Sequence, residues 1–177
     1  MNNNDYTYTR KRLIHYKQTL KEMKRLSLQY WMDLLVTNKF NFDFYNATLK
    51  EVHEFIKNRL QYISDPEGIE HLSRIKYSLA LANNGDYPLD CDDKTIILLA
   101  YLILQNYKFS GKPDKPFDVY ICVAGRRNKP HHVYPMADLP GFFSGLNLDS
   151  TYPVNVFGKP LFPEKFFEKY HLFRDLQ

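Results

Sequence analysis

The sequence of 177 residues predicts an α+β fold, and three observations support this prediction. Apolar residues in the first part of the chain recur at helical spacing. After about residue 116, runs rich in β-branched and aromatic residues alternate with polar turns, as in antiparallel strands. Between the two parts, residues 95–104 are apolar on every face and should be buried. A helical first half packed on a hairpin-rich sheet is therefore expected.

Residues 9–37 are expected to form one long helix. Apolar, Tyr and Ser residues recur there alternately three and four positions apart, from Leu13 to Leu34. We expect this seam to pack on the body of the protein or on a larger assembly rather than form a dimeric coiled coil. Basic residues crowd positions 10–25, with Glu22 the lone acid among them. A solvated helix face is the favoured interpretation, and a surface for nucleic acid or an acidic protein is the alternative.

Three further helices are expected before the sheet. Thr48 and Glu51 form a capping-box pattern at the start of one helix, a second spans residues 69–82, and a third spans residues 91–107. Loops or turns are expected at residues 38–46, 65–68 and 83–88. Strands are expected at residues 117–124, 131–137 and about 143–149, with a turn at 138–141 and a short final helix at 163–170.

Cys91 is the strongest candidate for chemistry because it stands in the first turn of the predicted buried helix. The free N–H groups and partial positive charge of a helix start favour a thiolate over a thiol. His132, on a predicted strand, and Asp149, at the end of the next one, follow in the chain. The order Cys, His, Asp predicts a nucleophile, a base and a group that orients the base. The alternatives are a small buried residue for Cys91 and a turn residue for Asp149.

Four blocks resemble phage- and prophage-encoded transglutaminase-like cysteine proteases of the papain-like superfamily. Residues 56–70 are similar to the segment that precedes the nucleophile in that family. Asp-Cys-Asp-Asp-Lys at 90–94, His-Val-Tyr at 132–134 and Leu-Asp-Ser-Thr at 148–151 are similar to its three catalytic blocks. The resemblance covers roughly residues 48–155. It implies a papain- or transglutaminase-like core with the nucleophile at a helix N-terminus, packed on an antiparallel sheet.

The resemblance divides the chain into an N-terminal helical extension (1–46), a transglutaminase-like catalytic domain (47–160) and an aromatic-rich tail (161–177). It implies a cysteine peptidase or amidase in which Cys91 forms an acyl-enzyme, with hydrolysis favoured over transamidation. The backbone N–H of Cys91 would be one oxyanion donor, and the side chain of Tyr62 is a candidate for the second. A protein or peptide substrate is expected, such as a capsid or tail component or a host envelope peptide.

The acids beside Cys91 disfavour a thiolate, because the negative charges of Asp90, Asp92 and Asp93 should raise the pKa of the thiol. Asp92 and Asp93 could instead satisfy free N–H groups at the helix start. Alternatively, a divalent cation neutralises the cluster. Periplasmic adhesin-releasing proteases, which are related by the same fold, bind calcium through acids flanking their Cys, and Asp90 and Asp92 match those positions. Calcium is therefore the candidate metal, and no other cofactor is expected.

The remaining Cys and His residues have structural interpretations. Cys122 lies in the middle of a predicted strand and is expected in the core, and two cysteines give no disulfide framework. His131 would point to the opposite face of its strand from His132. A surface or interface position is expected for His15, His53, His71 and His171.

Three functions compete. A cysteine peptidase ranks first, and second is a virion structural or assembly protein that keeps the fold with an idle triad. A nucleic-acid-binding module rests only on the basic helix, so nucleic acid is not the expected partner. The N-terminal helix could instead contact phage structural proteins. The chain shows no signal-peptide pattern and no apolar run of membrane-spanning length. We therefore expect no membrane partner, a cytoplasmic location at synthesis and, in a phage context, incorporation into a virion.

Overall fold

The computed structural model describes residues 8–11, 15–36, 40–66, 70–82, 89–141 and 143–176. It mixes helices with a four-stranded antiparallel sheet, so the α+β prediction is confirmed. The elements, in chain order, are β1 (Tyr8–Lys11), α1 (Tyr16–Tyr30), α2 (Asp33–Val36), α3 (Leu49–Arg59), β2 (Glu70–Ser73), α4 (Ile75–Leu81), α5 (Cys91–Ser110), β3 (Asp118–Gly125), β4 (His132–Leu139), β5 (Phe143–Asn147) and β6 (Phe166–His171).

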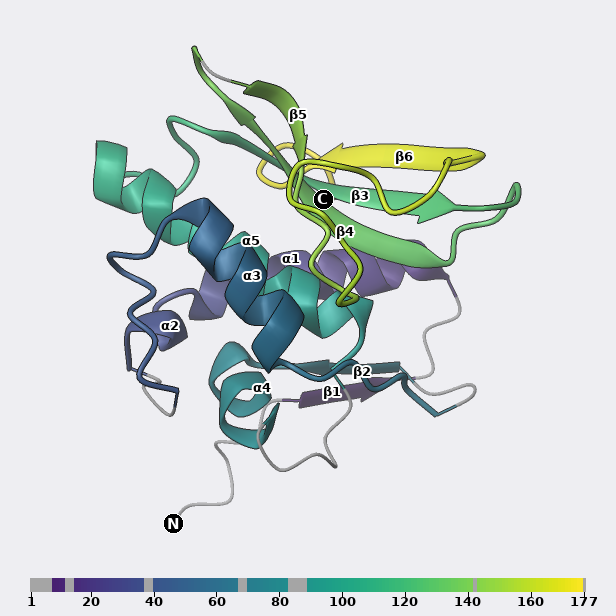
Figure 1. Cartoon of the computed structure of the whole chain (residues 1–177), viewed down its shortest axis with the longest axis horizontal. Helices are drawn as coiled ribbons and strands as arrows, with labels where there is room; N and C mark the ends of the chain where they lie inside the picture. Colours follow the sequence, from purple (N-terminus) through teal and green to yellow (C-terminus); the bar gives the residue numbers. More distant parts are fainter. Residues whose placement is uncertain are drawn as a thin grey trace.

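The main sheet has the strand order β5-β4-β3-β6 and lies against the helices α5 and α1 (Figure 1). Strand β3 is central and pairs with β4 and β6 on its two sides. Pro135 stands within β4 opposite Ile121, so the strand continues through the proline. The strands expected at 117–124, 131–137 and 143–149 are confirmed within two residues, although β4 extends to Leu139 and shifts the predicted turn.

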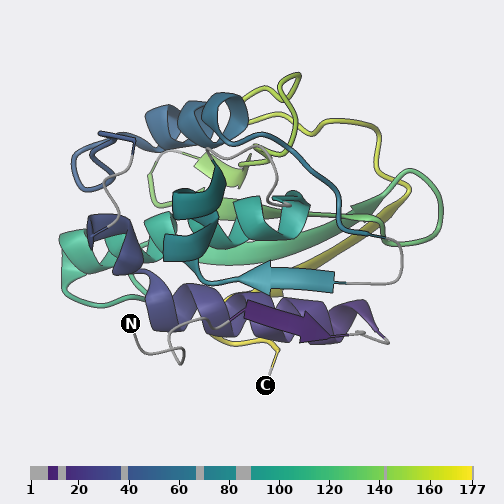
Figure 2. The ribbon, with the colours of Figure 1, turned by 90° about the horizontal axis from the view of Figure 1, so that it is seen from below.

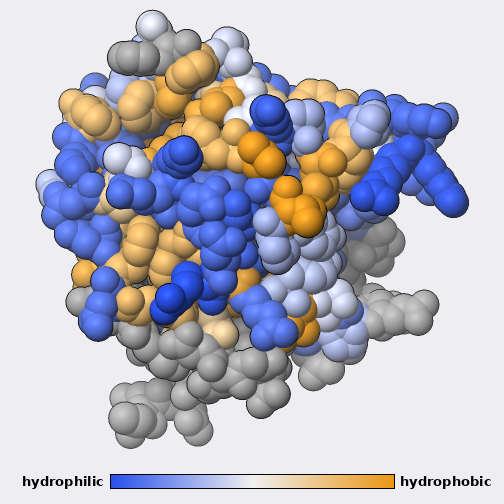
Figure 3. All heavy atoms as spheres, viewed as in Figure 1, coloured by the Kyte–Doolittle hydropathy of each residue, from blue (hydrophilic) through white to orange (hydrophobic). Residues whose placement is uncertain are grey.

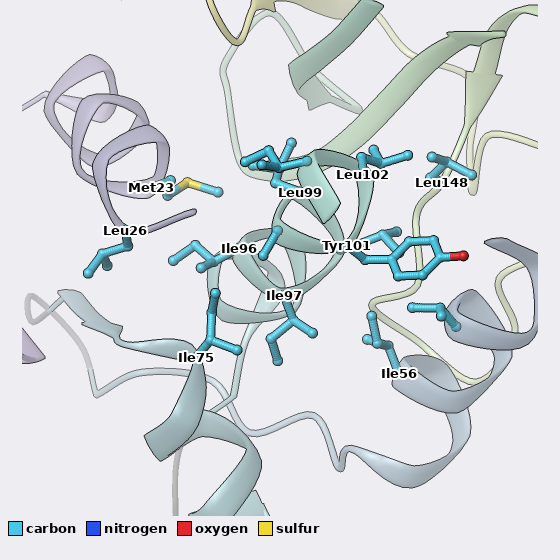
Figure 4. Packing of buried hydrophobic residues seen from close by; sticks show 14 of the residues in the cluster. Met23, Leu26, Ile56, Ile75, Ile96, Ile97, Leu99, Tyr101, Leu102 and Leu148 are labelled. Atoms are coloured by element: carbon cyan, nitrogen blue, oxygen red, sulfur yellow. The ribbon is translucent and has the colours of Figure 1, made fainter. Parts of the chain in front are cut away.

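Helix α5 is the centre of the core. Its residues from Asp92 to Asn106 are buried without interruption, as expected for a helix that is apolar on every face. Figure 4 shows its side chains between Met23 and Leu26 of α1, Ile56 of α3 and Leu148. The helix ends three residues later than predicted, where Gly111 adopts a left-handed conformation with φ 69°. This central position fixes Cys91, the first residue of α5, relative to both the helices and the sheet.

The single helix predicted for residues 9–37 is wrong in its first and last parts. Tyr8–Lys11 is a strand, and helix α1 begins only at Tyr16, because the side chain of His15 caps it by accepting from the N–H of Lys17. A second short helix, α2, follows after Trp31 and Met32. The predicted packing seam is correct where it is described, since Leu20, Met23 and Ser27 are buried. Leu13 lies outside the described residues.

The helix predicted for residues 69–82 is also wrong in its first half. Glu70–Ser73 forms β2, which pairs antiparallel with β1 in a separate two-stranded sheet, and α4 starts only after Arg74. Figure 2 shows this pair beside α1, and Figure 1 places it across the helices from the main sheet. The pairing satisfies backbone groups that a helix would otherwise satisfy, so a tertiary contact overrides the local apolar spacing.

The short helix predicted for residues 163–170 is a strand instead. Phe166–His171 forms β6 and pairs with β3 along its length. Its alternating burial fits an edge strand with one side on the core, and Phe and Tyr are favoured in strands. The last part of the chain thus completes the main sheet.

The helix cap and the aromatic contacts predicted around residues 40–55 are present. The Thr48–Glu51 capping box is present, with both reciprocal hydrogen bonds. The loop before it carries an aromatic cluster in which Phe42 stacks on Phe55. The turn predicted at 83–88 and residues 67–69 lie outside the described residues. Among the helices that the structure describes, none is both long and apolar enough to cross a membrane.

Candidate functional site

The start of α5 presents Cys91 at the surface of a cavity. Asp90 is the N-cap residue, and its carboxylate accepts a hydrogen bond of 2.9 Å from the N–H of Asp92. This cap fixes the first turn, so Cys91 follows as the first helical residue with its side chain half-buried. The cavity has a volume of about 320 Å³ and is lined by Cys91, His132 and residues of α1, β2 and β3.

His132 and Asp149 form a buried hydrogen-bonded pair. The Nε2 atom of His132 lies 2.8 Å from Oδ2 of Asp149, and the two side chains are 4% and 1% exposed. Because an ionised carboxylate only accepts, Nε2 must carry the proton, which leaves the lone pair on Nδ1. Burial alone would raise the pKa of Asp149, but the hydrogen bond and charge of His132 outweigh it, so this pKa lies below its usual value. The structure therefore brings together two predicted site residues from separate segments.

Strand β4 connects this pair to Cys91. The backbone N–H of Val133, next to His132, acts to lower the pKa of Cys91. One turn into α5, the hydroxyl of Thr95 donates to the carbonyl of Val133 at 3.3 Å. Cys91, His132 and Val133 all line the same cavity. The nucleophile candidate and the base candidate are thus held at one site by α5 and β4.

The carboxylates beside Cys91 oppose ionisation of the thiol, as the sequence predicts. Burial, followed by the charges of Asp92 and Asp90, raises the pKa of Cys91 well above its usual value, and the N–H of Val133 offsets only part of this. The sulfur lies 3.5 Å from Oδ1 of Asp92, where a protonated thiol can donate. At neutral pH this thiol is therefore protonated unless another charge or a substrate changes its environment.

The acid cluster is larger than the sequence indicates. Burial and neighbouring carboxylates raise the pKa of Asp90 to about 7 and the pKa values of Asp92 and Asp93 well above their usual range. Asp93 accepts from the N–H and hydroxyl of Ser73, and its second carboxylate oxygen is buried without a hydrogen-bond partner among the described residues. Asp93 therefore accepts hydrogen bonds from β2 rather than from N–H groups at the helix start.

The donor set fits a hard divalent cation. Ligand atoms of Asp65, Glu70 and Asp90 all lie within 4.8 Å of one another, as do those of Asp90, Cys91 and Asp92. Carboxylate oxygens suit calcium, and a cation would relieve the repulsion that raises these pKa values. Asp90 belongs to both groups. The sequence did not predict that Asp65 and Glu70 join the cluster, since their approach depends on the β1–β2 pair.

Aromatic side chains surround His132. The rings of Tyr134, Tyr152 and Phe162 have centroids 5.8 to 6.0 Å from the imidazole, and Tyr62 lies 4.8 Å from Tyr152. Burial, a hydrogen bond with Tyr152 and the charge of Cys91 raise the pKa of Tyr62. The Tyr62 hydroxyl thus stays protonated and can donate a hydrogen bond.

Two buried side chains that the sequence did not identify hold the segment of Asp149. His53 was expected at the surface but is 0% exposed, and its Nε2 lies 2.8 Å from the Asp149 carbonyl. Lys94 is 1% exposed and donates to the carbonyl of Thr151 at 2.8 Å. Burial lowers the pKa of Lys94 to about 8, and the nearby charge of Asp149 works against this shift. Capping or spacing patterns give no signal for either residue.

Of the structural assignments predicted for the other Cys and His residues, some are confirmed and some are wrong. Cys122 is fully buried in β3, as expected, and burial raises its pKa to about 12. His131 is exposed and stacks on Phe162, whereas His132 faces Asp149. The surface prediction is wrong for His171, which is buried and paired with Asp118 at 2.9 Å.

Basic residues flank one end of the cavity. The turn between β3 and β4 exposes Arg126, Arg127 and Lys129, just before Pro130 and His131 reach the cavity wall. Figure 3 shows a strongly hydrophilic projection where this turn leaves the sheet.

Comparisons of the chain with protein-family models, with curated proteins and with solved structures found no match. The resemblance to transglutaminase-like cysteine proteases accordingly stays a prediction, based on the sequence blocks and compatible with the geometry described above.

Proposed function

We propose that this protein is a cysteine peptidase or amidase of the transglutaminase-like, papain-related type, in which Cys91, His132 and Asp149 act as a unit. The observation that carries the proposal is the buried 2.8 Å contact between Asp149 and His132, a residue that lines the same cavity as Cys91. The three residues come from separate segments of the chain, and their proximity supports the proposal that they form one site.

The reaction would begin when Nδ1 of His132 takes the thiol proton and Sγ of Cys91 attacks a carbonyl carbon. The tetrahedral intermediate collapses as the C–N bond breaks, and the imidazolium returns its proton to the leaving amine. Water then attacks the thioester with His132 as the base, which releases the acid and restores the thiol. Asp149 holds the imidazole in the required tautomer and stabilises its charged form.

Two groups are proposed to stabilise the oxyanion. The backbone N–H of Cys91 belongs to the first turn of α5, where N–H groups have no partner within the helix. The Tyr62 hydroxyl is the second candidate, supported by the ring contacts that connect Tyr62 through Tyr152 to His132. Each such donor is typically worth about 3–4 kcal/mol in the transition state.

Asp90 and Asp92 would hold a calcium ion, with Asp65 and Glu70 as further oxygen ligands from the same cluster. When bound, the ion would neutralise carboxylates that otherwise disfavour the Cys91 thiolate. The effect on this chain's own residues is a lower thiol pKa, so His132 could remove the proton near neutral pH.

A generic acyl donor tests the proposal without knowledge of the natural substrate. The protein, with and without added calcium, is mixed with p-nitrophenyl acetate and analysed by mass spectrometry. We expect one acetyl group on Cys91, formed with a burst of nitrophenolate, and no acetylation of Cys91 in His132→Ala. Cys122→Ala is the control, because Cys122 is buried away from the cavity and its loss should leave the burst intact. No burst in the unaltered protein would reject the enzyme proposal.

A non-catalytic role is the second candidate, and one observation favours it. The carboxylate of Asp92 lies 3.5 Å from the Cys91 sulfur, an environment that disfavours a thiolate and that an idle triad could keep. In that case the chain would be a virion structural or assembly protein that keeps the fold. Normal particle assembly with Cys91→Ala, together with no acyl-enzyme under either calcium condition, would support this role.

A further inference from the structure

The Asp149 carboxylate is fixed by the turn in which it lies. Its Oδ1 accepts from the N–H of Thr151 at 3.1 Å, and its own N–H donates to the side chain of Asn147 at 3.0 Å. All residues from Asn147 to Thr151 are at most 4% exposed. The turn continues from the end of β5, where Asn147 pairs with Met136 of β4 and the N–H of Leu148 donates to the Pro135 carbonyl at 3.0 Å. Beyond Leu148, contacts with other elements hold the turn.

Two helices supply those contacts through buried polar side chains. His53 of α3 holds the Asp149 carbonyl, and Lys94 of α5 holds the Thr151 carbonyl, each at 2.8 Å. One of these carbonyls belongs to Asp149 itself, and the other belongs to Thr151, whose N–H donates to the Asp149 carboxylate. One turn of α5 therefore carries the thiol of Cys91 and the ammonium that fixes the segment of Asp149, three residues apart.

Burying the polar side chains of His53 and Lys94 costs free energy. Lys94 places an ammonium in the core, and the Nδ1 atom of His53 is buried without a hydrogen-bond partner among the described residues. Nε2 of His53 must carry a proton, because the carbonyl that it contacts can only accept. Burial lowers the pKa of His53, so Nδ1 is left unprotonated. This Nδ1 lies 3.5 Å from a carboxylate oxygen of Glu54. Apolar residues would bury the same surface without these penalties. A purely structural role therefore leaves the choice of these two residues unexplained.

We infer that His53 and Lys94 are positioning residues that hold the Asp149 turn so that its carboxylate orients His132. The inference rests on the proposed function for its catalytic consequence, but the geometry that it asserts can be measured independently. Neither residue touches the reacting atoms. Loss of either should displace Asp149 relative to the imidazole and slow acyl transfer at constant substrate binding.

The variants separate positioning from stability. His53→Met and Lys94→Met remove the donors and keep much of the volume, whereas His53→Gln keeps an N–H at a similar reach. Asn106→Leu is the matched control, because Asn106 is also buried on α5 and also holds backbone groups, those of Pro113 and Phe117. It should lower the stability in a similar way without touching the Asp149 turn.

Two readouts are needed. The first is the rate and KM of acylation by p-nitrophenyl acetate, and the second is the downfield proton NMR signal of His132 Nε2–H bonded to Asp149. We expect His53→Met and Lys94→Met to slow acylation about 10- to 100-fold at unchanged KM and to shift or broaden the signal. His53→Gln should recover most of the rate, and Asn106→Leu should change neither readout.

Folded Met variants with unchanged rate and signal would overturn the inference. If the Met variants do not fold, the contact can be tested in the unaltered protein. A scalar coupling across the hydrogen bond from His53 Nε2 to the Asp149 carbonyl carbon is expected. Its absence contradicts the proposed contact. If the unaltered protein forms no acyl-enzyme, the proposed function fails, while the NMR signal in the variants still tests the positioning.

Discussion

His132 Nε2 lies 2.8 Å from Asp149 Oδ2, and both side chains are almost completely buried. A second His–Asp pair, between His171 and Asp118, has nearly the same separation of 2.9 Å but joins β6 to β3 and does not line the cavity. The chain thus contains an internal reference against which the role of the first pair can be measured.

The first prediction concerns Asp149. Asp149→Asn should slow acylation of Cys91 about 10²- to 10⁴-fold, because an amide no longer stabilises the imidazolium or enforces the tautomer with Nε2–H. Pre-steady-state release of nitrophenolate measures the rate. Asp118→Asn breaks the reference pair and should leave that rate unchanged. Equal rates in the unaltered protein and Asp149→Asn would exclude Asp149 from the mechanism.

Tyr62 gives the second prediction. Tyr62→Phe should lower the acylation rate constant about 10²- to 10³-fold with little change in KM, since an oxyanion donor acts mainly in the transition state. Tyr120→Phe, which removes a half-buried tyrosine hydroxyl that bonds to Asp138 and does not line the cavity, is the matched control and should keep the full rate. A Tyr62→Phe enzyme with the full rate would remove Tyr62 from the oxyanion site.

The third prediction concerns the charge beside the thiol. In a chelator, Asp90→Asn should accelerate alkylation of Cys91 at pH 7, because loss of a neighbouring negative charge lowers the thiol pKa and increases the thiolate fraction. Asn is as good an N-cap as Asp, so α5 should start normally, whereas Asp90→Ala costs about 1 kcal/mol of stability. Calcium should accelerate alkylation of the unaltered protein and have a smaller effect on Asp90→Asn. If calcium and Asp90→Asn both leave the rate unchanged, the acid cluster does not control the thiol.

The fourth prediction is a pH dependence of stability. The pKa of Asp90 rises from about 3.9 in the unfolded chain to about 7 in the folded one, so the folded state holds the proton more tightly. This contribution to stability is fully present below about pH 4 and is lost as pH rises through about 7. Asp92 and Asp93 shift in the same direction. Asp149 has a lowered pKa, so its contribution is instead lost only below about pH 4.

Urea unfolding in chelator at pH 5 and pH 8 tests this prediction. The free energy of unfolding should be lower at pH 8, and Asp90→Asn should reduce the difference. Added calcium should raise the stability at pH 8, because an ion that binds only the folded state stabilises it. The lowered pKa of His53 acts in the opposite direction over this pH range, so the comparison with Asp90→Asn is decisive. The same change in the free energy of unfolding from pH 5 to pH 8 in Asp90→Asn and in the unaltered protein would contradict the proposed protonation of the cluster.

The sequence predicted those parts of the site that depend on local patterns. An N-cap acid followed by an all-apolar run located α5 and Cys91, and the strand-like run of His132 gave β4. The residues that support the site were not predictable in this way. His53 has the spacing of an ordinary helix residue, and Lys94 stands in a run that otherwise predicts a core, so only the folded arrangement shows what each one contacts.

The fold errors have the same origin. Strands β1 and β2 are short and stabilise each other across about 60 residues, so neither is detectable from its own sequence. Strand β6 follows Pro163 and Glu164, which resemble a helix start, but the pairing with β3 determines its conformation. The helical spacing around Ile75 correctly indicates α4. It also predicted helix for the residues before Arg74, which pair as strand β2 instead.

The most direct test of the central claim is the rate of iodoacetamide labelling of each cysteine between pH 4 and 10, resolved by mass spectrometry. With calcium present, we predict labelling of Cys91 well below the free-thiol pKa of about 8.5, lost in His132→Ala and retained in His171→Ala. Cys122 should label slowly in every variant because it is buried. Labelling of Cys91 that is slow in the unaltered protein and unaffected by His132→Ala would contradict an activated Cys–His pair.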